Sequence, residues 1–130
     1  MDHEKHENML FADEAFRIQG AVFEVSRQMG TGFLEAVYQE CLALEFAAPG
    51  ITFVASPPLV LAYKGQPLKQ SHGPDFVCFD RVIVELKVVR ELAPEHRAQV
   101  LNYLRATGLR LGLLVNCGCA PKARVKRLVL

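Results

Sequence analysis

Two acids and a lysine lie on adjoining β-type runs within residues 75–87. This stretch is better suited to catalysis than any other part of the chain. The run Val82–Val89 is rich in β-branched residues, which predicts a buried strand whose successive side chains point to opposite faces. Ile83, Glu85 and Lys87 then share one face, and Asp75 lies on the run before it. Two opposite charges in so apolar a strand are costly to bury unless they meet a metal, a partner or a water-filled cleft.

The chemistry that these side chains favour is metal-assisted attack on a phosphodiester. The carboxylates of Asp75 and Glu85 are hard oxygen ligands that suit Mg²⁺, or Mn²⁺ in its place. Lys87 can hold or polarise an attacking water and offset charge on the phosphate. The spacing Asp-x₉-Glu-x-Lys is weakly specific on its own, because exposed strands often carry such residues, so a surface role stays open.

Polar side chains on two predicted helices are candidates to support this set. Glu35 and Tyr38 are three residues apart and share one helix face. Gln99, Asn102 and Tyr103 share a face of a later helix. A solvated helix face is the alternative for both groups, with the tyrosines at the edge of the core.

Apolar periodicity and turn residues predict the elements that must position these side chains. Apolar residues at three- and four-residue steps predict helices, and short β-branched runs bounded by glycine and proline predict strands. We expect a central mixed β-sheet flanked by helices. The expected elements are helices at 7–29, 33–46 and 94–106, strands at 51–55, 59–63, 76–79, 82–89 and 111–115, an edge strand at 125–130, and a turn at 64–67.

Length and composition predict one globular domain over residues 1–130, with residues 1–8 frayed. Hydrophobic residues make up 51% of the chain and charged residues 22%, which is typical of a globular protein and not of a disordered one. No apolar run approaches the roughly 20 residues of a membrane span, and the first residues lack the pattern of a signal peptide. We therefore expect a cytoplasmic protein that does not enter the membrane.

The net charge of +1 hides an uneven distribution. Residues 1–80 hold 5 Lys and Arg against 11 Asp and Glu, whereas residues 81–130 hold 10 against 3. Such a division can provide a basic surface for a polyanion beside an acidic metal-holding region. Mutual neutralisation of the two parts across the fold is the equally open alternative.

Seven motifs follow one another along the chain. They are Gly32-Phe-Leu-Glu-Ala-Val-Tyr38, Tyr63-Lys-Gly65, Asp75-Phe-Val, Ile83-Val-Glu-Leu-Lys87, His96-x-x-Gln99-x-x-Asn-Tyr-Leu104, Leu111-Gly-Leu-Leu-Val-Asn116 and Lys126-Arg127. Taken together and in this order, they resemble the GxxExxY family of small bacterial and archaeal proteins, which is placed in the PD-(D/E)XK nuclease superfamily. The resemblance covers about residues 10–130. It implies a restriction-endonuclease-like α/β fold with the order helix, helix, strands, helix, strand, strand.

The resemblance also implies roles for individual residues. Asp75 and Glu85 would bind Mg²⁺ or Mn²⁺ with Glu35 as a further acid, Lys87 would act on the attacking water, and Gln99 would position Lys87 or the substrate. Tyr38, Asn102 and Tyr103 would contact the substrate or support the site.

Three functions follow as expectations. The first is a metal-dependent nuclease acting on nucleic acid, with DNA as the expected substrate. The second is a module that binds nucleic acid or a partner and keeps the nuclease fold without turnover. The third is an oligomerising structural protein whose acids are surface residues. A homodimer is consistent with the small size and the charge of the chain.

Overall fold

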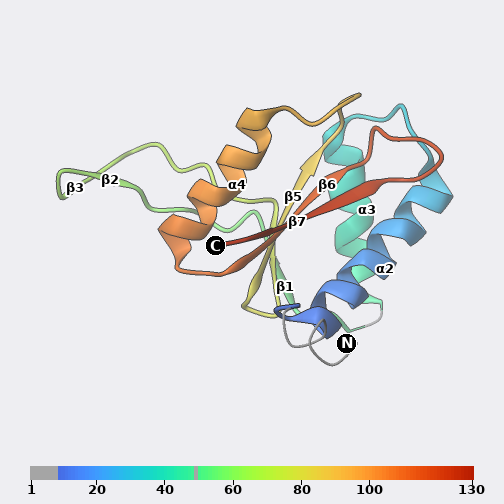
Figure 1. The fold of residues 1–130 in the computed structure, drawn as a ribbon, viewed down its shortest axis with the longest axis horizontal. Coiled ribbons are helices and arrows are strands. Elements are labelled where there is room, and N and C mark those ends of the chain that lie inside the picture. Colours follow the sequence, from blue (N-terminus) through green and yellow to red (C-terminus); the bar gives the residue numbers. More distant parts are fainter. Residues whose placement is uncertain (1–8, 49) are drawn as a thin grey trace.

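The computed structural model describes residues 9–48 and 50–130, so the expected fraying of residues 1–8 lies outside the described residues. The helices and strands follow the predicted order of two helices, a group of strands, one helix and two strands (Figure 1). The elements are α2 (Ala12–Met29), α3 (Glu35–Ala47), β1 (Phe53–Ala55), β2 (Ala62–Tyr63), β3 (Gln66–Pro67), β4 (Phe76–Cys78), β5 (Val82–Lys87), α4 (Pro94–Thr107), β6 (Leu111–Asn116) and β7 (Arg124–Val129).

A five-stranded mixed sheet forms the centre of the molecule, with the strand order β1-β4-β5-β6-β7. β5 and β6 run parallel, and the other neighbouring strands are antiparallel. Helices α2 and α3 lie on one side of the sheet and α4 on the other (Figure 1). This mixed α/β architecture confirms the predicted restriction-endonuclease-like fold class, and the predicted hairpin of β4 and β5 and edge strand β7 are both present.

The central strand β5 shows the predicted alternation of side chains. Val82, Val84 and Leu86 pack into the cluster formed with α2 and α3, whereas Ile83 packs into the cluster formed with α4. All four are fully buried, which fits a strand covered on both faces. The same parity places Glu85 on the α4 side of the sheet.

The helix termini follow local sequence signals. α2 begins at Ala12, later than the predicted start at residue 7. Its last residue is Met29, because the following Gly30 has a φ of 67° that breaks the helix. Pro94 occupies the first turn of α4, where its missing N–H costs nothing, and Gly108 closes that helix in the left-handed region. Among the described residues, no helix is long and apolar enough to cross a membrane.

The segment 59–67 differs from the prediction. Only Ala62–Tyr63 of the expected strand 59–63 is extended and paired, and its partner Gln66–Pro67 was expected to belong to the turn. The turn is Lys64-Gly65, whose φ values of 49° and 78° suit a two-residue hairpin. This hairpin projects away from the sheet with both strands exposed (Figure 1), whereas Leu59 before it is buried in the cluster with α4 without belonging to a strand.

The segments after β5 and β6 are held together closely. The Cys117 N–H donates to the Lys87 carbonyl at 2.8 Å, and the side-chain oxygen of Asn116 accepts from the N–H groups of Val89 and Gly118 at 3.1 and 2.9 Å. A Cβ atom at Gly118 would lie 2.5 Å from the Val89 carbonyl oxygen. Residue 118 must therefore be glycine for the two segments to approach in this way.

We predict that Gly118→Ala lowers the free energy of unfolding by about 1–3 kcal/mol, because the added methyl group meets backbone that cannot rotate away. Gly20→Ala is the matched control, since its Cβ position on α2 has no atom within 4 Å. That change should stabilise the protein by about 0.5–1 kcal/mol through helix propensity. Urea denaturation of both variants measures this, and equal stability of the two would contradict the packing described.

Candidate active site

Asp75 and Glu85 are brought together by the pairing of β4 with β5. The antiparallel register places Phe76 opposite Val84, so Asp75 lies beside Glu85. The Asp75 N–H donates to Glu85 Oε1 at 3.1 Å, and the Leu86 N–H donates to Asp75 Oδ2 at 2.7 Å. Each carboxylate is thus fixed by a backbone N–H from the neighbouring segment.

Lys87 extends this pair to helix α4. Its Nζ lies 3.4 Å from Glu85 Oε2 and donates to Gln99 Oε1 at 2.7 Å. The Lys87 side chain is 17% exposed, so its ammonium group is largely held by these two partners. The structure therefore places four of the predicted residues, Asp75, Glu85, Lys87 and Gln99, in one connected set.

Burial and a neighbouring negative charge raise the pKa of Glu85. Glu85 is only 4% exposed, and desolvation followed by the negative charge of Asp75 raises its pKa from 4.5 to about 7, although Lys87 opposes the rise. A carboxyl with this pKa is partly protonated at neutral pH. A cation beside Glu85 would offset the negative charge of Asp75, which is the second cause of the raised pKa.

Glu35 lies at the first turn of α3, close to the same site. Its pKa is raised by desolvation and then by the charge of Asp75, and it is lowered by Lys87 and His72. These interactions place Glu35 within electrostatic reach of the connected set. They also include an interaction with His72, which stands three residues before Asp75.

The donor atoms fit a divalent cation held by two carboxylates. Asp75 and Glu85 each use one oxygen for a backbone N–H, which leaves Asp75 Oδ1 without such a bond and Glu85 Oε2 paired with Lys87 at 3.4 Å. Mg²⁺ is commonly bound through one or two carboxylates with waters completing its shell. Within residues 9–48 and 50–130, no group of three or more His, Cys, Asp and Glu side chains is gathered to hold a metal. Glu35 as a third ligand stays a prediction.

Tyr38 supports the turn before Glu35. Its side chain is fully buried, and its hydroxyl donates to the Gly30 carbonyl at 2.7 Å and accepts from the Phe33 N–H at 3.3 Å. Of the two roles left open for this residue, the structure shows the structural hydrogen bond. Tyr38 therefore fixes the path of the chain between α2 and α3.

Asn102 and Tyr103 line a cavity of about 380 Å³ beside Gln99. Asn102 is exposed and accepts from the Arg105 guanidinium at 3.0 Å. Tyr103 is 5% exposed, and its hydroxyl has no hydrogen-bond partner among the described residues. Burial and then the negative charges of Glu85 and Asp75 raise its pKa to about 12, so it remains a neutral donor near the two acids.

We predict a pH-dependent stability that originates at Glu85. As pH rises from about 4.5 to 7, the unfolded chain ionises this carboxyl before the folded protein does, so ionisation favours unfolding. In EDTA, Glu85→Gln should gain stability over the wild type as pH rises through this range, by up to about 3 kcal/mol at pH 8. Thermal denaturation from pH 4.5 to pH 8 measures the difference, and a constant difference would contradict the assignment.

Comparison with known proteins is consistent with this geometry. A scan against protein-family models matches residues 12–128 to the PD-(D/E)XK nuclease superfamily. No match was found among the curated proteins or among the solved structures. The matched range contains every residue of the connected set and almost the whole chain. The chain therefore belongs to the PD-(D/E)XK nuclease superfamily.

Proposed function

We propose that this protein is a metal-dependent nuclease that hydrolyses phosphodiester bonds of nucleic acid, with DNA as the expected substrate. The observation that carries the proposal is the connected set of Asp75, Glu85, Lys87 and Gln99 in a chain of the nuclease superfamily. An acid pair with an adjacent lysine supplies the charges that phosphoryl chemistry requires.

Asp75 and Glu85 would hold Mg²⁺ or Mn²⁺, in keeping with the general use of divalent metals by nucleases of this superfamily. When bound, such an ion lowers the pKa of water and offsets negative charge on the phosphate. Glu35 would add negative charge near the cation. Glu85 must lose its proton to act as a ligand, and the pKa of about 7 makes this possible near neutral pH.

Lys87 would orient the attacking water or a phosphate oxygen. A lysine ammonium has three N–H donors, and here one is given to Gln99 while Glu85 Oε2 lies near a second. The third is left for the reacting groups. Gln99 fixes Nζ from α4, so the amide acts as a positioning residue that keeps the ammonium beside the acids.

We predict that Asp75→Asn and Lys87→Ala each reduce metal-dependent cleavage by at least about 100-fold, because each removes a charge that acts on the reacting phosphate. Plasmid, single-stranded DNA and RNA, each incubated with Mg²⁺ or Mn²⁺, provide the assay. Lys122→Ala is a matched control, since Lys122 lies over the Phe23 ring of α2. The proposal fails if the wild type cleaves none of these substrates, or if cleavage survives both active-site changes.

We also predict a role for the Tyr103 hydroxyl in positioning the acids. Tyr103→Phe keeps the ring, and it removes only a neutral donor near Glu85 and Asp75. Cleavage should fall about three- to tenfold. The pH at which activity rises should move upward, because the carboxylates of Glu85 and Asp75 lose a neighbouring donor that favours their ionised forms. An unchanged pH profile would restrict Tyr103 to packing.

A second candidate is a nucleic-acid- or partner-binding module that kept the fold without turnover. It is favoured by the observation that no group of three or more His, Cys, Asp and Glu side chains gathers at the site within the described residues. In that case salt-sensitive binding persists in Lys87→Ala while no metal supports cleavage. The GxxExxY assignment, a homodimer and a cytoplasmic location are further proposals, of which the first is supported by the motif residues gathered at the site.

A further inference from the structure

A cavity beside the candidate active site is lined by several basic residues. It has a volume of about 690 Å³, and we call it the basic groove. Its walls are the loop after β5, the first turns of α4, and the segments where β6 ends and β7 begins. Its charged lining residues are Arg90, Glu91, Arg97, Arg124 and Lys126.

The four cations of the basic groove lack anionic partners within the described part of the chain. None of them has a hydrogen bond or an ion pair there, and all four are exposed. Cations on the opposite side of the sheet behave differently: Arg27 pairs with Glu24 at 2.9 Å and Arg81 pairs with Glu14 at 3.1 Å. The basic excess of residues 81–130 is therefore not neutralised at this groove, which is left with a field that attracts anions.

Strand register connects the basic groove with the active-site acids. Lys87 lies opposite Asn116, which lies opposite Arg124, and Glu85 is joined to Lys126 through Leu114 in the same way. Directly opposed residues of neighbouring strands point to the same face of a sheet. Arg124 and Lys126 thus lie on the face that carries Lys87 and Glu85, about 10 Å away across two strand spacings.

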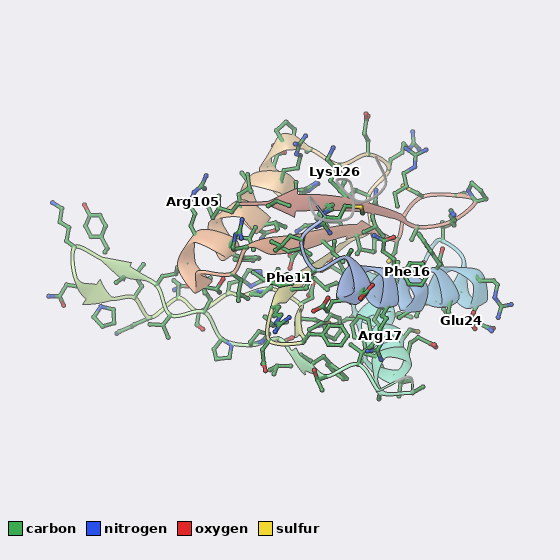
Figure 2. The ribbon with its side chains drawn as sticks, turned by 60° about the horizontal axis from the view of Figure 1, so that its bottom comes forward. Phe11, Phe16, Arg17, Glu24, Arg105 and Lys126 are labelled. Carbon is green, nitrogen blue, oxygen red and sulfur yellow. The ribbon has the colours of Figure 1, made fainter. Side chains whose placement is uncertain are left out.

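The packing of this face supports the register argument. Leu114 and Leu128, which share the parity of Lys126, are both buried in the cluster with α4. Figure 2 shows Lys126 on β7, on the other side of the sheet from the part of α2 that carries Phe16 and Glu24. The same sheet face therefore carries the acids in its centre and cations toward its edge.

The wall of the groove is rigidly built. Asn116 is 1% exposed and binds the N–H groups of Val89 and Gly118, so it fastens the loop that carries Arg90 to the segment after β6. The close approach at Gly118 allows no side chain between them. The position of Arg90 is thus set by buried contacts, although its charged group is exposed.

We propose that the basic groove binds the sugar–phosphate backbone of nucleic acid next to the bond held at Asp75 and Glu85. The inference deepens the proposed nuclease function, on which it rests for the position of the scissile bond. Arg90, Arg97 and Arg124 can bind phosphate oxygens through paired N–H groups, and Lys126 adds a point charge. Such contacts fix the register of the strand without reading its sequence.

The test is the salt dependence of binding by the double variant Arg124→Gln/Lys126→Gln. Fluorescence anisotropy with labelled single-stranded and duplex oligonucleotides is measured in EDTA, so that cleavage plays no part. We expect binding at least tenfold weaker at low salt, and a slope of log K against log salt that is smaller by between one and two.

Arg27→Gln/Arg81→Gln is the matched control, because it removes the same charge from exposed positions on the side of α2. This control should bind with the slope of the wild type. An equal loss in both double variants, or no loss in either, would overturn the groove assignment. So would tighter wild-type binding to polyglutamate than to the oligonucleotides, which would point to an acidic protein.

The groove and the nuclease proposals fail separately. A wild type that cleaves in Mg²⁺ while the groove variant keeps the wild-type slope overturns the groove alone. A wild type that never cleaves, with the slope reduced only in the groove variant, overturns the nuclease and supports the groove.

Discussion

The site depends on the reciprocal hydrogen bonding between Asp75 and β5. The Asp75 N–H binds the Glu85 carboxylate, and the Leu86 N–H binds the Asp75 carboxylate, so two negative groups are held side by side by two backbone donors. Backbone donors favour the ionised carboxylates but do not cancel their mutual repulsion. Burial and then the negative charge of Asp75 raise the pKa of Glu85.

The rest of the fold serves to hold this pair and to bring Lys87 and Gln99 to it. β5 is buried on both faces, which fixes its register against β4 and β6. Helix α4 packs on β6 at Gly112, where an added Cβ would lie 2.6 Å from Val100, and this approach brings Gln99 to Lys87. The parallel pairing of β5 with β6 then carries the same face outward to β7 and the basic groove.

The sequence alone predicted those features that depend on local periodicity. The alternation of Val82, Ile83 and Val84 placed Glu85 and Lys87 on one face, and the hairpin signal placed Asp75 beside them. The order of helices and strands followed from apolar spacing and from Pro94 and Gly108. The predicted connection of Lys87 with Gln99 came from the family resemblance and is present at 2.7 Å.

Features that depend on long-range register were not predictable. The interaction of His72 with Glu35 was not predicted, because Glu35 lies on α3, far from His72 in the sequence. The hydrogen bonds of the buried Asn116 were not predicted either. Its side-chain oxygen accepts from Val89 N–H, which lies far from it in the sequence, as well as from Gly118 N–H. The strand 59–63 was predicted too long. The observed pairing covers only Ala62–Tyr63, whose side chains are exposed, whereas Leu59 is buried in the cluster with α4 without belonging to a strand.

We propose that Asp75 and Glu85 form one cation site. Anomalous scattering from crystals soaked in Mn²⁺ is the decisive measurement. We expect an anomalous peak between the two carboxylates that is absent in Asp75→Asn crystals treated in the same way. Carboxylates that remain free of Mn²⁺ at saturating concentration, or a peak that persists in Asp75→Asn, would contradict it.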